Sequence, residues 1–89
     1  MATVHLDSVL SDFVPTRTLS STAPTLEALL GDLEARFPKL KFRIRDETGS
    51  VRRFIRVFVN GTEVVGARAL STPLGPKDTV DVLHSVQGG

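Results

Sequence analysis

Two glycines, Gly88 and Gly89, end the sequence and are the residues best suited to chemistry. They close a segment, residues 83–89, that follows a strand-like stretch at residues 79–82. Because glycine has no Cβ, this pair forms a narrow, permissive thread that could lie inside the site of another protein. From Ser85 onward, five extended residues reach about 16–18 Å. The carboxylate of Gly89 is ionised at neutral pH and could attack an activated phosphate, so we predict a reactive main-chain end.

The side chains offer little other chemistry. There is no cysteine, which excludes a disulfide, a thiolate nucleophile and a cysteine metal site. A lone histidine on a small domain is more often incidental than a general base, and the sequence gives no reason for His5 and His84 to share a metal. We therefore expect no catalytic side chain, no metal and no cofactor bound by the chain itself.

Length and composition indicate one small globular domain of 89 residues, with 40% apolar and 24% charged residues. The first residues have neither the basic leader nor the apolar core of a signal peptide. No stretch approaches the roughly 18 apolar residues of a membrane span. We expect a cytoplasmic protein with no membrane partner.

The cations are unevenly placed, since seven of the eleven lie between residues 39 and 56. A nucleic-acid surface usually adds aromatic side chains that stack on bases, and this chain has no Tyr and no Trp. We expect instead a solvated face or a docking patch for an acidic partner enzyme, and no nucleic acid.

The pattern of residues 25–37 predicts the one main helix of the domain. Thr25 can cap its first free N–H groups, and Pro38 disfavours helical geometry at the residue before it. One apolar stripe at helical spacing is suited to cover a sheet: Leu26, Leu29, Leu30, Leu33 and Phe37.

Strand patterns surround this helix. Alternation over residues 2–10 and again near residues 17–21 predicts an N-terminal hairpin. Residues 53–59 and 62–65 predict a second hairpin around Asn60-Gly61, because both turn positions tolerate positive φ. The last strand covers residues 79–82. Alternation favours an extended segment at 39–45, followed by a turn at 46–50. The order strand, strand, helix, strand, strand, strand is typical of an α+β domain.

The strand at 53–59 has two different faces. Alternation turns its β-branched residues, Ile55, Val57 and Val59, toward the helix. The opposite face would carry Phe54, Arg56 and Phe58, with Leu83 beside them, and exposed aromatic residues among charges are typical of a protein-docking surface. The alternative is that residues 39–53 cover the two phenylalanines.

Four stretches carry a family resemblance: Phe-Ile-Arg-Val-Phe-Val-Asn-Gly at 54–61, Leu-Ser-Thr-Pro-Leu at 70–74, Lys-Asp-Thr-Val-Asp-Val-Leu at 77–83, and Val-Gln-Gly-Gly at 86–89. With the helix, their order resembles the ubiquitin-like β-grasp fold of the prokaryotic sulfur-carrier family. That family includes the small subunit of molybdopterin synthase, the thiamine-pathway carrier and the carrier that feeds a cysteine synthase. The stretch at 44–53 is most similar to the cysteine-synthase-linked carriers. The resemblance implies a β-grasp domain at 1–84 and an extended tail at 85–89.

The resemblance also implies the chemistry. An adenylating enzyme of the ubiquitin-activating type would present Gly89 to ATP, which that enzyme and not this chain would bind. A sulfur donor would then leave a thiocarboxylate on Gly89 for a downstream sulfur-accepting synthase. Val86, Gln87 and Gly88 would be the residues of the tail that these enzymes recognise.

One residue departs from the family pattern, in which proline is common where His84 stands. The substitution loosens the predicted exit of the tail and leaves open which downstream pocket accepts it. Three alternatives to a cysteine-linked carrier also stay open: a molybdopterin synthase small subunit, a ubiquitin-like protein modifier, and an ordinary binding module whose diglycine is accidental.

Overall fold

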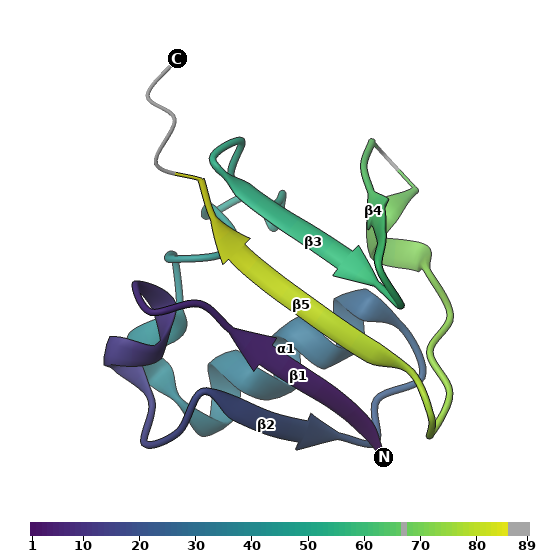
Figure 1. Ribbon diagram of the computed structural model, residues 1–89. Coiled ribbons are helices and arrows are strands. Elements are labelled where there is room, and N and C mark those ends of the chain that lie inside the picture. Colours follow the sequence, from purple (N-terminus) through teal and green to yellow (C-terminus); the bar gives the residue numbers. More distant parts are fainter. Residues whose placement is uncertain (67, 86–89) are drawn as a thin grey trace.

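The computed structural model describes residues 1–66 and 68–85, which form one mixed sheet covered by one long helix (Figure 1). The sheet has the strand order β2-β1-β5-β3-β4. Its central pair, β1 and β5, is parallel, and the other neighbours are antiparallel. The elements are β1 (Ala2–Leu6), β2 (Thr18–Ser21), α1 (Leu26–Arg36), β3 (Ile55–Val59), β4 (Thr62–Val64) and β5 (Thr79–His84), with short 3₁₀ helices at Leu10–Phe13, Pro38–Leu40 and Ala69–Ser71. The predicted α+β order is confirmed.

Helix α1 forms the other layer of the core. The hydroxyl of Thr25 accepts a hydrogen bond from the N–H of Ala28 at 3.2 Å, which confirms the predicted cap. The helix buries the leucines of its stripe against apolar side chains from all three central strands. The most deeply buried of these are Leu26, Leu29, Leu30 and Leu33 from the helix and Val4, Val80 and Val82 from the sheet. Ser21 of β2 adds one buried polar group, which donates to Asp32 of α1 at 2.8 Å. The opposite face of the sheet is not covered by the helix (Figure 1).

The Asn60-Gly61 turn is confirmed, with φ values of 53° and 84°. Asn60 does more than turn the chain. Its side-chain amide donates to Asp78 at 3.0 Å, and its carbonyl accepts from the N–H of Thr79 at 2.9 Å. These bonds join the β3–β4 hairpin to the start of β5. Asn60 and the Gly75 N–H both donate to Asp78, and they hold the pKa of its carboxyl below the ordinary value of 3.8.

The predicted extended segment at 39–45 is wrong. Residues 38–40 form a 3₁₀ helix, and the chain then turns through Phe42, whose φ is 68°. The period-2 alternation of this segment resembles that of a strand because Leu40 and Ile44 are both fully buried, but neither residue belongs to a strand. Arg45 holds the end of this segment against the helix, since its guanidinium donates to Glu34 of α1 at 2.7 and 3.1 Å. These hydrogen bonds to Glu34 raise the pKa of Arg45.

Three strand boundaries differ from the prediction by two residues or more, and one of them is the start of β3, which lies at Ile55 rather than at residue 53. Strand β1 ends at Leu6 rather than near residue 10, because the chain turns into the 3₁₀ helix at Leu10–Phe13 while Leu10 still points into the core. Strand β5 continues through His84, two residues beyond the prediction, since His84 still has a register partner, Ile55, on β3.

Within the described residues, no helix is long and apolar enough to cross a membrane. The same part of the chain contains no group of three or more side chains that could hold a metal ion.

Candidate functional site

The four residues predicted to enter a partner enzyme, Val86, Gln87, Gly88 and Gly89, lie outside the described residues. The division into a domain at 1–84 and a tail at 85–89 thus stays a prediction. What the structure describes is the place where the chain leaves the sheet, at the end of β5 (Figure 1).

Hydrogen bonds hold this exit from two sides. On the β1 side, the carboxylate of Asp7 accepts from the backbone N–H of His84. The second oxygen of the same carboxylate accepts from the N–H of Leu10 at 2.9 Å, which fixes the side chain in place. On the β3 side, the N–H of Ser85 donates to the carbonyl of Phe54 at 2.7 Å. The main chain is therefore held by hydrogen bonds as far as Ser85.

The ring of His84 packs against the ring of Phe54, with 5.1 Å between the ring centroids and 54° between the planes. Its Nδ1 is buried and has no hydrogen-bond partner among the described residues. A histidine without a carboxylate at its ring is poorly arranged for general base chemistry. The ring instead packs at the base of the tail, where a family proline would limit the backbone by its own ring.

The predicted docking residues mostly meet on the open face of the sheet, opposite α1. Arg56 and Leu83 are direct cross-strand partners on β3 and β5, and Phe58 lies two residues further along β3, opposite Asp81. Paired residues in an antiparallel ladder point to the same side, so these side chains form one surface. Phe54 is 40% exposed and lies at the edge of this surface, beside the tail exit.

The alternative in which residues 39–53 cover Phe54 is wrong. Leu40 and Ile44 of that segment are buried with the core leucines of α1, and Arg45 pairs with Glu34 of the helix. The segment thus packs with the helical layer and leaves Phe54 exposed.

Polar residues that were not predicted to belong to the docking face complete it. Glu63 of β4 pairs with Arg56 at 3.3 Å. His5 of β1 is in register with Asp81 of β5. The result is a small apolar centre around Phe58 and Leu83 with a charged border, which is typical of transient protein interfaces.

The missed residues had different signals in the sequence. His5 could have been found from the alternation of residues 2–6, which places it opposite the buried Val4 and Leu6. Asp7 had no local signal, because its role depends on contact with the end of β5. Glu63 follows from the Asn60-Gly61 turn once the register of that hairpin is known, since it faces Phe58.

A family model described as the ThiS family matches residues 10–89 of this chain. The sulfur carrier protein CysO of Mycobacterium tuberculosis is 32% identical over 75 residues, which cover 82% of this chain and 81% of that protein. The crystal structure of M. tuberculosis CysO matches with a TM-score of 0.86 and 28% identity over 97% of this chain and 100% of the other. CysO in the Amycolatopsis orientalis BexX/CysO complex matches with a TM-score of 0.88 and 27% identity over the full length of both chains.

These matches confirm the β-grasp fold and the resemblance to cysteine-linked sulfur carriers predicted from the sequence. The family match extends over nine tenths of the sequence, from the 3₁₀ helix after β1 to the last glycine. The chain therefore belongs to the ThiS family.

Proposed function

We propose that this chain is a sulfur carrier that delivers sulfur as a thiocarboxylate on Gly89. The observation that carries the proposal is the family match over residues 10–89, which includes Gly88 and Gly89 as well as the folded domain. The name of the M. tuberculosis relative, sulfur carrier protein CysO, supports the same role. The proposal takes Gly89 as the terminal residue of the functional protein.

The chemistry would run in two steps on the activating enzyme. A carboxylate oxygen of Gly89 attacks the α-phosphorus of ATP, the bond to pyrophosphate breaks, and an acyl adenylate forms. Hydrosulfide then attacks the acyl carbon, AMP leaves with its electron pair, one proton is released, and a thiocarboxylate remains. The chain binds no cofactor of its own in this scheme, since the partner enzyme holds the ATP.

The contribution of this chain is recognition and orientation. The hydrogen bonds at Asp7 and Phe54 support a tail that starts in one direction, which lowers the entropic cost of entering a narrow site. Gly88, Gln87 and Val86 would pass through that site, and Gly88 would have no Cβ to obstruct it. Phe58, Leu83 and Arg56, with Phe54 at the border, would form the docking face.

Two kinds of partner follow from the scheme: a ubiquitin-activating-type adenylating enzyme and a downstream sulfur-accepting synthase of cysteine or specialised-metabolite synthesis. The BexX/CysO complex contains a similar carrier bound to another protein, which supports the expectation that this chain also forms a complex with a partner protein. The proposal places both partners and the carrier in the cytoplasm.

Intact-mass spectrometry tests the proposal. The full chain is incubated with ATP, sulfide and an adenylating enzyme from a ThiS-family pathway, and we expect a gain of about 16 Da, the difference between sulfur and oxygen, on the C-terminal peptide. A chain that lacks Gly89 should show no gain. No mass change with several such enzymes, in the presence of normal binding to them, would contradict the proposal.

The same samples distinguish the alternatives. A protein modifier would yield lysine peptides that carry the C-terminal glycine in an isopeptide bond. A molybdopterin synthase small subunit would co-purify with a larger catalytic subunit.

A further inference from the structure

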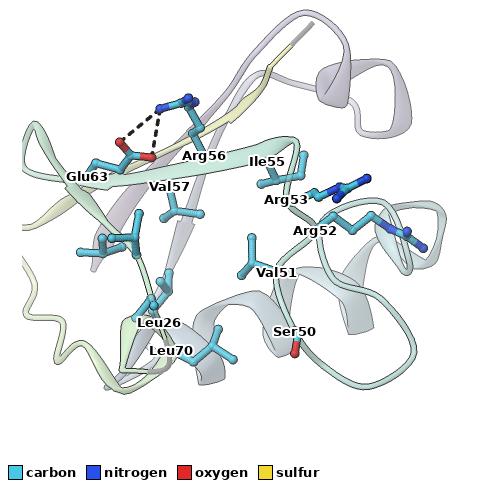
Figure 2. A pocket seen from close by; sticks show the side chains of 14 residues that line it. Leu26, Ser50, Val51, Arg52, Arg53, Ile55, Arg56, Val57, Glu63 and Leu70 are labelled. Atoms are coloured by element: carbon cyan, nitrogen blue, oxygen red, sulfur yellow. Dashed lines mark hydrogen bonds and ion pairs between the residues drawn. The ribbon is translucent and has the colours of Figure 1, made fainter. Parts of the chain in front are cut away.

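A groove of about 680 Å³ lies on the helix side of the sheet, between the β3–β4 hairpin, the start of α1 and residues 50–53 (Figure 2). Its lining combines aliphatic side chains with charged ones, and Figure 2 shows the aliphatic Val51, Ile55, Val57, Leu26 and Leu70 around it. Ile55, Val57 and Leu26 also belong to the buried core, so the groove reaches the core where its side chains are held firmly. This groove and the open face proposed above for the carrier's partners lie on opposite sides of β3 and meet at Arg56 and Glu63, which border both surfaces.

The charge at one end of the groove is positive. Arg52 and Arg53 follow Val51 at that end, and their side chains extend outward together in Figure 2. Neither forms an ion pair in the described part of the chain. Arg52 does interact with Asp46, whose pKa is lowered first by hydrogen bonds from Thr48 and also by the charge of Arg52. The Nε of Arg52 donates to the carbonyl of Phe42 at 2.8 Å, which holds this guanidinium in place while its terminal nitrogens still face outward. Arg56, at the upper rim, is already paired with Glu63.

The opposite side of the groove is an edge of the sheet. Strand β4 is the last strand on that side and has only three residues, Thr62–Val64. Beyond it the chain continues along the groove through Val65, whose aliphatic side chain is 72% exposed. An edge strand beside apolar pockets can bind an extended peptide, because the peptide adds main-chain hydrogen bonds to the edge and places alternate side chains in the pockets.

From these features we infer that the groove binds an extended acidic segment of a partner protein, with aliphatic or aromatic side chains against Val51, Val57 and Leu70 and carboxylates at Arg52 and Arg53. The unpaired arginines select the acidic chemistry, and the sheet edge selects a peptide over a compact small molecule. The inference concerns a second docking surface and does not depend on the sulfur chemistry proposed above.

Amide chemical shifts of the full chain, measured in ¹⁵N-labelled protein without ATP or any enzyme, test the inference. The probes are three acetylated and amidated nonapeptides with a central Val₃, Leu₃ or Phe₃ flanked by three glutamates on each side, and three matched peptides with lysine in place of glutamate. We expect at least one acidic peptide to shift the amides of residues 51–57 and 63–66 with a Kd of about 1 mM or tighter, in a salt-dependent way. The lysine peptides should cause no such shift.

Charge-reversal variants locate the site. Arg53→Glu, at an exposed position, should weaken the binding of the acidic peptide at least fivefold, and the double variant with Arg52→Glu at least tenfold. Val65→Asp should weaken it comparably without touching the core. The matched control is Arg17→Glu, an exposed arginine beside β2 at the other edge of the sheet, which should bind the peptide as the unchanged chain does.

Four results with the peptides would overturn the inference. They are no shift with any acidic peptide, equal shifts with the lysine peptides, shifts confined to residues 3–5 and 79–83 on the open face, and unchanged affinity in the arginine variants. Groove amides that shift with protein concentration alone, or on removal of residues 86–89, would instead assign the groove to a second copy or to the chain's own tail, and would equally overturn it.

Discussion

The carboxylate of Asp7 accepts a hydrogen bond from the backbone N–H of His84, a residue 77 positions later in the chain. This bond joins the end of β1 to the last residue of β5, at the point where the main chain leaves the sheet. It links the stability of the domain to the position of His84, and it can be removed without changing the sequence of residues 85–89.

Asp7→Ala should loosen the tail exit. Two backbone N–H groups, those of Leu10 and His84, lose their acceptor, and an unsatisfied polar group costs about 1–3 kcal/mol when it is shielded from water. We expect a lower free energy of unfolding, faster hydrogen exchange at His84 and Ser85, and a higher KM of the activating enzyme for the carrier. Asp7→Asn, which keeps one oxygen acceptor, should recover part of each effect. Unchanged exchange at His84 in the alanine variant would show that the bond does not hold the exit.

Gly88→Trp should abolish adenylation and leave the fold intact. The bulky side chain would obstruct a narrow channel in the enzyme, whereas the core that holds the domain together is built from residues 2–82. The measurements are pyrophosphate release with the activating enzyme and the thermal midpoint of the free carrier. The matched control is Arg17→Trp, which places the same bulky side chain at an exposed position beside β2 and should retain adenylation. Full activity of the Gly88→Trp variant would argue against a narrow path for the tail.

Leu83→Asp should weaken docking to the activating enzyme by at least tenfold. Leu83 is 38% exposed at the centre of the open face, and an added charge there costs desolvation on binding. The matched control is Val9→Asp, an aliphatic side chain 40% exposed and outside the sheet. Each change should alter the free energy of unfolding by about 1 kcal/mol or less. Isothermal titration calorimetry measures the affinities, and equal loss in both variants would contradict a docking role for the open face.

Asn60→Gly should make the stability of the domain less dependent on acid pH. Glycine keeps the positive φ of the turn but removes the hydrogen bond that lowers the pKa of Asp78. A carboxyl with a lowered folded-state pKa contributes stability above its ordinary value of 3.8, and that contribution is lost as pH falls through the folded pKa. The variant should therefore be less stable than the unchanged chain near neutral pH, with a smaller difference at lower pH.

Urea unfolding at pH 6 and at pH 2.5 measures that difference. The hydrogen bond from the Thr79 N–H to Asn60 is lost at both pH values, so the two curves should approach each other without coinciding. A difference that grows at pH 2.5 would contradict the assigned role of Asp78.

The sequence predicted those parts of the fold that depend on near neighbours. The leucines of α1 recur every three or four residues, Thr25 and Pro38 mark the ends, and the Asn60-Gly61 turn needs only its own two residues. Each of these features is decided within one turn of helix or one hairpin, so the local pattern was sufficient.

Features that depend on distant contacts could not be predicted in the same way. Residues 39–45 alternate like a strand, but their shape depends on Glu34 of the helix, which pairs with Arg45, and on Phe13, over whose ring Arg43 stacks at 4.5 Å. The residues of the candidate site also differ in whether local patterns or distant contacts determine them. Arg56, Phe58 and Leu83 followed from strand alternation, whereas Asp7 is recognised only when β1 and β5 are seen to lie side by side.

The position of β5 in the middle of the sheet has a mechanical consequence. A partner that draws the last residues into a deep channel pulls along β5, and the ladders to β1 and β3 share that load in shear. Many hydrogen bonds would have to break together before the strand could slide. We therefore expect the domain to stay folded when a partner binds and pulls on its C-terminal end, over repeated cycles of binding and release.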